Sequence, residues 1–334
     1  MFRVRVLNFC KRKGTELREG AEWKGELKMK AFVTGVGGQL GHDVMNELAK
    51  RGFEGVGTDL APEYSGIQDG TSVVSMPYVQ LDITDPDQVR KVMNEVKPDV
   101  CIHCAAWTAV DKAEEFPDKC RLVNAGGTEN IAKVCEELDI PMMYFSTDYV
   151  FDGNGTRPWE PDDPYAPLDV YGKTKAEGEE AVIAHVKKFF ILRIAWVFGT
   201  NGHNFIKTML KLAKTHDTLR VVSDQIGTPT YTYDLARLVV DMIQTDKYGK
   251  YHVTNEGGYI SWYDFTCEIF RQAGITNVKV IPVTSEEYGA AAKRPYNSRM
   301  NRSKITENGF KPLPDWKDAL ARYLDILKKQ GETD

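Results

Sequence analysis

Tyr171 and Lys175 form a Y-x-x-x-K pattern, and these two residue types could carry out proton transfer. The spacing predicts a helix over 171–186, on which residues four apart share one face. A free phenol titrates near pH ~10, and lowering its pKa by about 3 units takes roughly 4 kcal/mol. One ammonium about 4 Å away supplies that order of energy at an effective dielectric constant near 20. We therefore expect Lys175 to lower the pKa of Tyr171, which could then act as a general acid or base.

Hydroxyl groups are predicted to lie close to this pair. The Y-x-x-x-K pattern follows a predicted strand at 141–151 that carries Ser146 and Thr147. Hydroxyls at the carboxyl end of a parallel strand can hydrogen-bond a substrate carbonyl, which makes Thr147 a catalytic candidate. Two alternatives stay open from the residues alone. The Y-x-x-x-K could belong to an ordinary surface helix, and the two hydroxyls could simply cap the strand end.

A glycine-rich stretch, GVGGQLG from Gly35 to Gly41, joins an apolar segment at 29–34 to a helical pattern at 40–52. Glycine lets the backbone turn sharply and approach a pyrophosphate, and a helix N-terminus adds free N–H groups and a positive dipole end. The spacing is G-x-x-G-x-x-G rather than the usual G-x-G-x-x-G, so its place at the first strand–helix junction carries the argument. We expect a dinucleotide to bind here, and the predicted contacts are Gly35, Gly38, Gln39 and Leu40.

Residues at the ends of later strands extend this predicted cofactor site. Asp59 ends the second predicted strand, 54–60, where a carboxylate can bind the adenosine ribose and repel a 2′-phosphate. This favours NADH over NADPH as the cofactor, and a simple turn aspartate before Pro62 is the alternative. Further contacts are predicted along the same sheet edge, at Asp82 and Ile83, which end the third strand, and at Ala105, Ala106 and Thr108, which follow the fourth.

Strands and helices are predicted to alternate through the first half of the sequence. The predicted strands lie at 29–34, 54–60, 79–85, 98–106 and 141–151, and the helices between them at 40–52, 85–97 and 124–139. This order predicts an α/β fold with a doubly wound, Rossmann-type parallel sheet. The strands are continuous apolar runs, as expected when both faces of a sheet are covered by helices.

The pattern changes beyond Phe151, where a Gly-, Pro- and Asp-rich loop leads to the helix at 171–186 and a strand at 189–199. The last third mixes helical and strand patterns. We predict a dinucleotide-binding domain mainly over 29–200 and a smaller, mixed α/β substrate-binding domain mainly over 201–334, the two being interleaved. Residues 1–28 are predicted to be a disordered basic extension, or to reflect a start codon placed too early.

Composition limits the partners of the protein. The chain has 334 residues and a net charge of −5, which argues against a general electrostatic hold on nucleic acid. No apolar run approaches the roughly 20 residues of a membrane span, and no signal peptide is recognisable, so no membrane association is expected. Six cysteines fit a reducing compartment, and we expect a cytoplasmic protein. Cys101 and Cys104 form a C-x-x-C inside an apolar run, which is more typical of buried strand thiols than of a zinc site.

Seven segments together narrow these expectations. They are GVGGQLG, CAAWTAVDKAE, FSTDYVFDG, VYGKTKAEGE, RIAWVFGTNGHNF, VVSDQIGTPTYTYDLA and KRPYNS, which run from Gly35 to Ser298. In combination they resemble the dTDP-4-dehydrorhamnose reductase family of the extended short-chain dehydrogenase/reductase superfamily. The resemblance implies hydride transfer from a nicotinamide to the C4 ketone of the nucleotide sugar dTDP-6-deoxy-L-lyxo-4-hexulose, the last step of dTDP-L-rhamnose synthesis.

The resemblance also implies roles for individual residues. By analogy, Tyr171 donates a proton to the forming alkoxide, Lys175 binds the nicotinamide ribose and tunes Tyr171, and Thr147 hydrogen-bonds the reacting oxygen. The positions that match the lining of the sugar-nucleotide site are Val110, Asp111, Asp148, Tyr149, Trp196 and Asn204. Trp196 could equally be a core residue, because it sits in a predicted strand. Arg294, with Lys293 beside it, could neutralise the substrate diphosphate, and an exposed solvated pair is the alternative.

Some members of this family dimerise through acidic residues that bind Mg²⁺. Asp43 stands where those members carry Glu, and the remaining acidic residues have no counterpart that we can place. The pattern therefore predicts no metal ligands, although a Mg²⁺ site stays open, and it favours a monomer or a weak homodimer. Two other functions stay open as well. One is a sugar-nucleotide epimerase or dehydratase, and the other is a partner-binding protein like the regulatory subunit of methionine adenosyltransferase.

Overall fold

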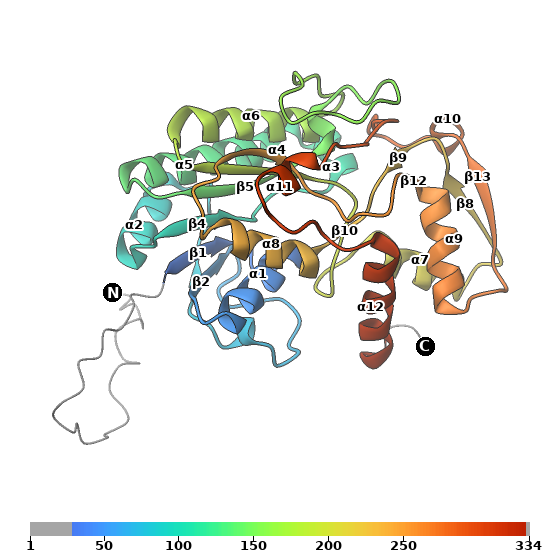
Figure 1. The fold of residues 1–334 in the computed structure, drawn as a ribbon, viewed down its shortest axis with the longest axis horizontal. Helices are drawn as coiled ribbons and strands as arrows, with labels where there is room; N and C mark the ends of the chain where they lie inside the picture. Colours follow the sequence, from blue (N-terminus) through green and yellow to red (C-terminus); the bar gives the residue numbers. More distant parts are fainter. Residues whose placement is uncertain (1–28, 332–334) are drawn as a thin grey trace.

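A seven-stranded parallel sheet forms the centre of the computed structural model, which describes residues 29–331 (Figure 1). The strand order is β11-β6-β5-β4-β1-β2-β3, and all neighbouring pairs are parallel. The strands are β1 (Lys30–Thr34), β2 (Glu54–Asp59), β3 (Tyr78–Gln80), β4 (Val100–His103), β5 (Met142–Thr147), β6 (Phe189–Ile194) and β11 (Gly249–His252). The doubly wound, Rossmann-type sheet predicted from the sequence is confirmed. The predicted extension at 1–28 lies outside the described residues.

Helices cover both faces of this sheet (Figure 1). One face carries α1 (Gln39–Lys50), α8 (Thr232–Met242) and α11 (Ser303–Glu307), and the other carries α2 (Pro86–Val96), α5 (Thr128–Glu137) and α6 (Val170–His185). Side chains of β1 alternate between the two faces. Ala31 and Val33 pack with α1 and α8, and Phe32 packs with α2 and α5. Both faces are thus buried, as the continuous apolar strands predicted.

A second cluster of elements, here called the small lobe, packs beside the sheet. It contains β7 (Val197–Phe198), β8 (Thr218–Val222), β9 (Ile226–Gly227), β10 (Thr230–Tyr231), β12 (Ile260–Ser261), β13 (Lys279–Val283), α7 (Phe205–Ala213), α9 (Trp262–Ala273), α10 (Ser285–Tyr288) and α12 (Trp316–Lys329). Its aromatic core includes Phe198, Phe265, Trp316 and Tyr323, all buried. The small lobe mixes helices with short strands, as the sequence predicted.

The chain passes back and forth between the two parts. After entering the small lobe at β7, it returns to the large sheet to form α8 and β11, and later α11. A boundary near residue 200 therefore separates the parts only approximately, and the division into two domains stays a prediction.

The predicted strand at 189–199 is two strands, because the backbone turns at Trp196. Trp196 has a φ of +50°, in the left-handed region that bulky residues rarely adopt. β6 ends before this residue at Ile194, and β7 starts after it at Val197 and pairs with β10 of the small lobe. Trp196 thus marks the place where the chain leaves the large sheet.

Several other predicted boundaries move by a few residues. The predicted strand at 79–85 ends at Gln80, and the one at 141–151 ends at Thr147. Short elements occupy the connections: η1 (Ser72–Val74), α3 (Val110–Glu115), α4 (Pro117–Arg121), the π-helical turn η2 (Leu122–Gly127) and η3 (Asp148–Val150). Among residues 29–331, no helix combines the length and the apolar character needed to cross a membrane.

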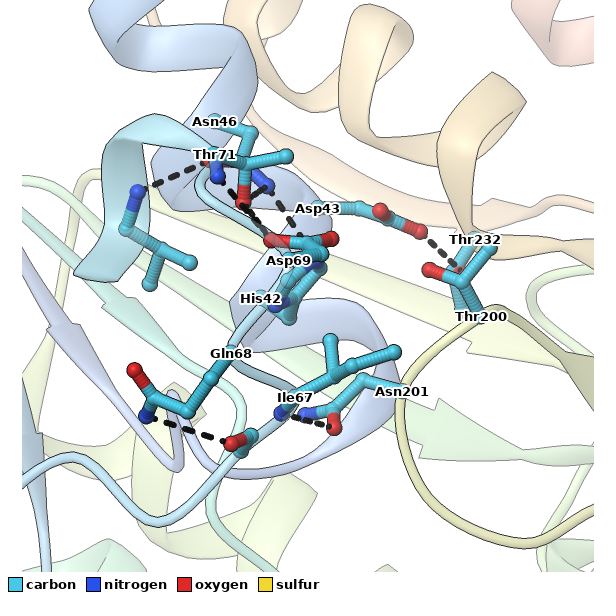
Figure 2. A network of polar contacts seen from close by, with 12 residues as sticks. His42, Asp43, Asn46, Ile67, Gln68, Asp69, Thr71, Thr200, Asn201 and Thr232 are labelled. Carbon is cyan, nitrogen blue, oxygen red and sulfur yellow. Dashed lines mark hydrogen bonds and ion pairs between the residues drawn. The ribbon is translucent and has the colours of Figure 1, made fainter. Parts of the chain in front are cut away.

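Asp43 is a buried carboxyl between α1 and α8. It accepts a hydrogen bond from the hydroxyl of Thr232, which begins α8 (Figure 2). Burial, with Asp69 and Asp234 nearby, raises the pKa of Asp43 to about 7, and the bond from Thr232 offsets part of that rise. The contact between these two helices therefore includes a group that titrates near neutral pH.

Asp43→Asn is expected to flatten the pH dependence of stability. The carboxyl pKa is about 7 in the folded chain and about 4 in the unfolded chain. The stability that Asp43 contributes is therefore present below pH ~4 and lost as the pH rises through 7. An amide does not ionise, so the variant avoids the cost of charging Asp43 in the folded chain. Its free energy of unfolding, relative to that of the native chain, should therefore increase by up to a few kcal/mol from pH ~5 to pH ~8. Urea unfolding at both pH values measures this, with Asp162→Asn, an exposed site, as control. A stability difference that does not change with pH would contradict the expectation.

Candidate active site

The glycine-rich stretch forms a tight turn between β1 and α1. Gly35 has a φ of +69°, and a Cβ there would come within 2.6 Å of the Ala105 amide nitrogen at the end of β4. A Cβ on Gly41 would overlap the carbonyl oxygen of Gly35. These two glycines therefore let the turn lie against β4 and let α1 begin directly behind it. Helix α1 has no side-chain cap at its N-terminus, and Gly38 at that position is exposed. Free N–H groups at an exposed helix N-terminus suit an anionic ligand.

Asp59 ends β2 beside this turn, where the sequence placed it. One carboxylate oxygen accepts a hydrogen bond from the Gly37 N–H at 2.8 Å, and the other accepts one from the Leu60 N–H at 2.8 Å. A carboxylate has about four acceptor positions, so Asp59 can still accept from a further hydroxyl. In addition to the predicted role, Asp59 thus holds the glycine turn in place.

The other predicted cofactor contacts follow β3 and β4. Asp82 accepts hydrogen bonds from the backbone and hydroxyl of Thr84, and Ile83 is buried against Gly127. Ala105, Ala106 and Thr108 lie directly after β4, at the sheet edge that carries the glycine turn. Asn124, which the sequence argument did not single out, binds both the N–H and the carbonyl of Trp107 in this segment, at 2.8 and 3.1 Å.

Helix α6 carries Tyr171 and Lys175 and packs very closely on the sheet. Asp169 caps its N-terminus by accepting a hydrogen bond from the Gly172 N–H at 2.7 Å. A Cβ on Gly172 would overlap the carbonyl oxygen of Tyr149, and a Cβ on Gly178 would overlap the hydroxyl of Tyr144 in β5. Two glycines inside the helix therefore set how closely α6 can approach β5 and the turn after it.

Lys175 is buried, with 2% of its surface exposed, and its Nζ lies 4.0 Å from the centre of the Tyr144 ring. Burial lowers the pKa of Lys175 to about 7, although Glu179, one turn further along α6, counteracts this. Glu179 is itself fully buried and forms an ion pair with Arg193 of β6 at 2.8 Å. The sequence argument missed this pair, because it depends on the packing of α6 against β6.

The environment of Tyr171 corrects one expectation. Burial raises the pKa of the Tyr171 phenol above its usual value, Asp148 and Asp169 raise it further, and a hydrogen bond with Thr147 lowers it. The pKa is raised and not lowered, so the predicted lowering by the Lys175 ammonium is wrong for this arrangement. The physical reason is that Lys175 contacts the Tyr144 ring, while Tyr171 faces the end of β5. Tyr171 stays protonated at neutral pH.

The end of β5 and the turn after it carry several buried polar groups, of which Thr147 shares a hydrogen bond with Tyr171. Thr147 is buried, and its hydroxyl donates to Asp148 at 3.1 Å and accepts from the Tyr149 N–H at 3.2 Å. The neighbouring Ser146 hydroxyl is buried and has no hydrogen-bond partner. Burial raises the pKa of Asp148 to about 6. The capping role that the sequence left open for Thr147 is therefore present. Thr147 makes this capping contact in addition to its hydrogen bond with Tyr171. The donor of the Ser146 hydroxyl is unused.

A cavity of about 590 Å³ adjoins this group at Tyr149, whose ring meets that of Tyr171 edge-on with centroids 5.5 Å apart. Of the residues predicted to bind substrate, Tyr149 and Arg294 line the cavity, and Lys293 does so as well. The small lobe adds residues that the sequence argument did not identify: Phe205, Met209, Arg220, Trp262 and Tyr288. Their signal in the sequence was weak, because aromatic and apolar residues in helices are usually core residues.

Asp111 and Arg294, both predicted to bind substrate, contact each other. Their side chains form an ion pair at 2.7 Å, and the second oxygen of Asp111 accepts from the Ala292 N–H at 3.1 Å. Val110 begins the same helix, α3. The pair fixes the 290–294 segment against α3 at the rim of the cavity.

Trp196 and Asn204 do not line the cavity. Trp196 stacks on Trp262 with ring centroids 3.7 Å apart, so it lies behind the cavity wall that Trp262 forms. Asn204 caps α7, and its amide donates to the side chain of Gln39 at 3.1 Å and to Tyr323 at 2.8 Å. The structure thus brings a predicted substrate residue, Asn204, against a predicted cofactor residue, Gln39.

The sequence suggested two possible metal sites, a Mg²⁺ site that includes Asp43 and a zinc site at Cys101 and Cys104. Within the part of the chain that the structure describes, no group of three or more His, Cys, Asp or Glu side chains is arranged to hold a metal ion. Cys101 is buried in β4, and Cys104 lies just beyond the end of that strand. Burial raises the pKa of the Cys104 thiol. A raised pKa disfavours the thiolate form that binds metals.

Comparison with known proteins adds independent findings. A family model described as the RmlD substrate binding domain matches residues 29–329. A dTDP-4-dehydrorhamnose reductase of Escherichia coli strain K12 is 40% identical over 258 residues, which cover 74% of this chain and 85% of that relative.

Solved structures show the same similarity. A crystal structure of a dTDP-4-dehydrorhamnose reductase from Clostridium acetobutylicum has a TM-score of 0.81 and 43% identity, covering 90% of this chain and 100% of that one. A dTDP-4-dehydrorhamnose reductase from Bacillus anthracis, solved in complex with NADP, has a TM-score of 0.81 and 37% identity, with the same coverage of 90% and 100%.

Gly178→Ala is expected to destabilise the chain, although alanine is the better helix former by about 1 kcal/mol. The added methyl overlaps the Tyr144 hydroxyl and lies 2.8 Å from the carbonyl oxygen of Asn124, so α6 must move. Overpacking of this kind costs about 1–3 kcal/mol. Gly126→Ala is the matched control, because a Cβ there would meet only Leu122, at 3.7 Å. Urea unfolding compares the two variants. A Gly178→Ala variant as stable as Gly126→Ala would show that the close approach of α6 does not matter.

Proposed function

Because the chain belongs to the dTDP-4-dehydrorhamnose reductase family, we propose that it reduces the C4 ketone of dTDP-6-deoxy-L-lyxo-4-hexulose to give dTDP-L-rhamnose, using a nicotinamide dinucleotide. The observation that carries the proposal is the juxtaposition of Tyr171 with Thr147, beside the cavity at Tyr149. A protonated phenol that shares a hydrogen bond with a hydroxyl suits the protonation of an oxygen that becomes negatively charged.

The residues at the sheet edge fit a dinucleotide. The uncapped N-terminus of α1 and the exposed Gly38 suit the pyrophosphate, and Asp59 suits the adenosine ribose. The bound nicotinamide would supply the hydride that reduces C4. Lys175 of α6, which lies against the Tyr144 ring of β5, is the proposed partner of the nicotinamide ribose. Its buried amine, near neutrality in pKa, can donate hydrogen bonds in either charge state.

Cofactor preference is a finer part of the proposal. Asp59 places a carboxylate where a 2′-phosphate would have to lie, and repulsion between the two favours NADH. The relative from Bacillus anthracis was solved with NADP, so the family does not impose this preference. The ratio of kcat/KM for NADH and NADPH measures it, and a clear advantage for NADPH would reject it.

Proton delivery falls to Tyr171. Because burial keeps its pKa raised, the phenol is protonated at neutral pH and can act as the acid without prior activation. Thr147 shares a hydrogen bond with the phenol. Once the proton has moved to the C4 oxygen, the Thr147 hydroxyl can turn from Asp148 and donate to the phenolate that forms. Tyr171 ends the step as phenolate and must recover a proton before the next turnover.

The cavity suits the nucleotide part of the substrate. Phe205 and Trp262 form an aromatic wall with ring centroids 4.5 Å apart, which suits stacking of a thymine base. Arg294 and Lys293 line the side that continues towards Tyr149, where cationic side chains suit a diphosphate. Asp111, which pairs with Arg294, holds the guanidinium in place for this contact.

Tyr171→Phe should reduce turnover of the dTDP-hexulose by a factor of about 10²–10⁴, because it removes the general acid and leaves the ring in place. Steady-state oxidation of NADH measures turnover, and the dissociation constant of NADH should stay within a factor of about two. Tyr233→Phe, an exposed site, is the control. If Tyr171→Phe turns over within about threefold of the native chain, another group delivers the proton.

A further inference from the structure

One segment of the small lobe reaches across to the glycine turn of the large sheet. Residues 199–204 connect β7 to α7, and Asn201 in this segment is buried, with 4% of its surface exposed. Its side-chain amide nitrogen donates to the carbonyl oxygens of Gly37 and Gly38, at 2.8 and 3.1 Å. Its side-chain oxygen accepts from the backbone N–H of Ile67 at 3.0 Å (Figure 2). Both N–H donors of this amide and its oxygen are therefore bound to backbone groups.

The arrangement requires a primary amide. A side chain at this position must donate two hydrogen bonds to carbonyls on one side and accept one from an N–H on the other, which only Asn or Gln can do. The space is also tight, because a Cβ on Gly66 would lie 2.8 Å from the Asn201 nitrogen. An aspartate would fit the space, but it would place a carboxylate against two carbonyl oxygens.

The carbonyls that Asn201 holds determine where neighbouring N–H groups point. In a trans peptide the C=O of one residue and the N–H of the next point to opposite sides. Holding the Gly38 carbonyl therefore directs the N–H of Gln39 away from Asn201. Gln39 is the first residue of α1, and the first N–H groups of a helix have no partner within the helix. These are the donors that an anionic ligand at this helix end would use.

Asn201 also joins the glycine turn to the loop that follows β2. The 60–71 loop begins just after Asp59, and Ile67 in this loop is bound by Asn201. Helix α1 holds this loop on either side of Ile67. The Tyr64 hydroxyl lies 2.6 Å from Nδ1 of His42. At the far end of the loop, Asn46 donates to the Thr71 hydroxyl at 3.0 Å (Figure 2). The loop, the turn and the 199–204 segment thus form one connected unit around the start of α1.

We propose that Asn201 is a positioning residue for the dinucleotide: from the small lobe, it fixes the glycine turn in the conformation that binds the pyrophosphate. This inference rests on the proposed function, because it presumes that the turn binds a nicotinamide dinucleotide. Cofactor affinity then depends on the 199–204 segment of the small lobe. The last residue of this segment, Asn204, also contacts Gln39.

The test measures binding rather than turnover. Calorimetry gives the dissociation constants of NADH and of ADP-ribose, which carries the pyrophosphate without the nicotinamide, for the native chain, Asn201→Ala and Asn201→Asp. We expect both constants to rise about tenfold in the alanine variant and further in the aspartate variant. The value of kcat at saturating NADH should stay within about threefold. Asn201→Ser, which keeps one donor, should fall between the native chain and Asn201→Ala, and it replaces the aspartate variant if that one does not fold.

Tyr251→Phe is the matched control for stability. It removes another buried side-chain donor to a backbone carbonyl, that of Lys247 at 2.6 Å, on the edge strand β11 away from the turn. Asn201→Ala with native affinity for both ligands would overturn the proposal. An equal loss of affinity in Tyr251→Phe would also overturn it, because the effect would then be general destabilisation. If the native chain binds neither NADH nor NADPH, the proposed function fails instead.

Discussion

The close approach of helix α6 to strand β5 is the constraint on which the rest of the site depends. Gly172 and Gly178 face the Tyr149 carbonyl and the Tyr144 hydroxyl, where any side chain would overlap. A glycine inside a helix costs about 1 kcal/mol relative to alanine, so two of them weaken α6 as an isolated helix. In return, Tyr171 lies beside Thr147, and Lys175 is buried against the Tyr144 ring. Both side chains reach these positions only because the backbone of α6 approaches β5 so closely.

Burial then sets the electrostatics of the site. It raises the pKa values of Asp148 and Asp169 to about 6, raises that of the Tyr171 phenol, and lowers that of Lys175 to about 7. Each shift favours the uncharged form, because low-dielectric surroundings penalise charge. Glu179 and Arg193 are also fully buried, and they form a direct ion pair in which each group is the partner of the other. Among these groups the Tyr171 phenol keeps its proton at neutral pH, which suits an acid that must donate one.

Much of the fold and part of the site could be predicted from local sequence patterns. The glycine turn, the alternating strands and helices, and the pair at 171 and 175 depend on residues close together in the chain. The features that could not be predicted depend on contacts between distant segments. Asn201 binds Gly37 across the two parts of the molecule. Arg294 and Asp111 form an ion pair with each other, whereas the sequence predicted that both bind the substrate. The pKa of Tyr171 was predicted in the wrong direction because burial depends on tertiary packing. The break at Trp196 requires a left-handed backbone that no pattern in a β-rich segment indicates.

The central claim is that this chain reduces a nucleotide-sugar ketone with net consumption of its cofactor. The most direct measurement incubates the full-length protein with enzymatically made dTDP-6-deoxy-L-lyxo-4-hexulose and excess NADH, and follows NADH absorbance together with the sugar product. We expect one NADH to be oxidised for each hexulose converted, and dTDP-L-rhamnose to be the product. Conversion of the hexulose without net oxidation of NADH or NADPH would contradict it and would indicate an epimerase or dehydratase. No conversion at all, with intact cofactor binding, would contradict it in favour of a binding role.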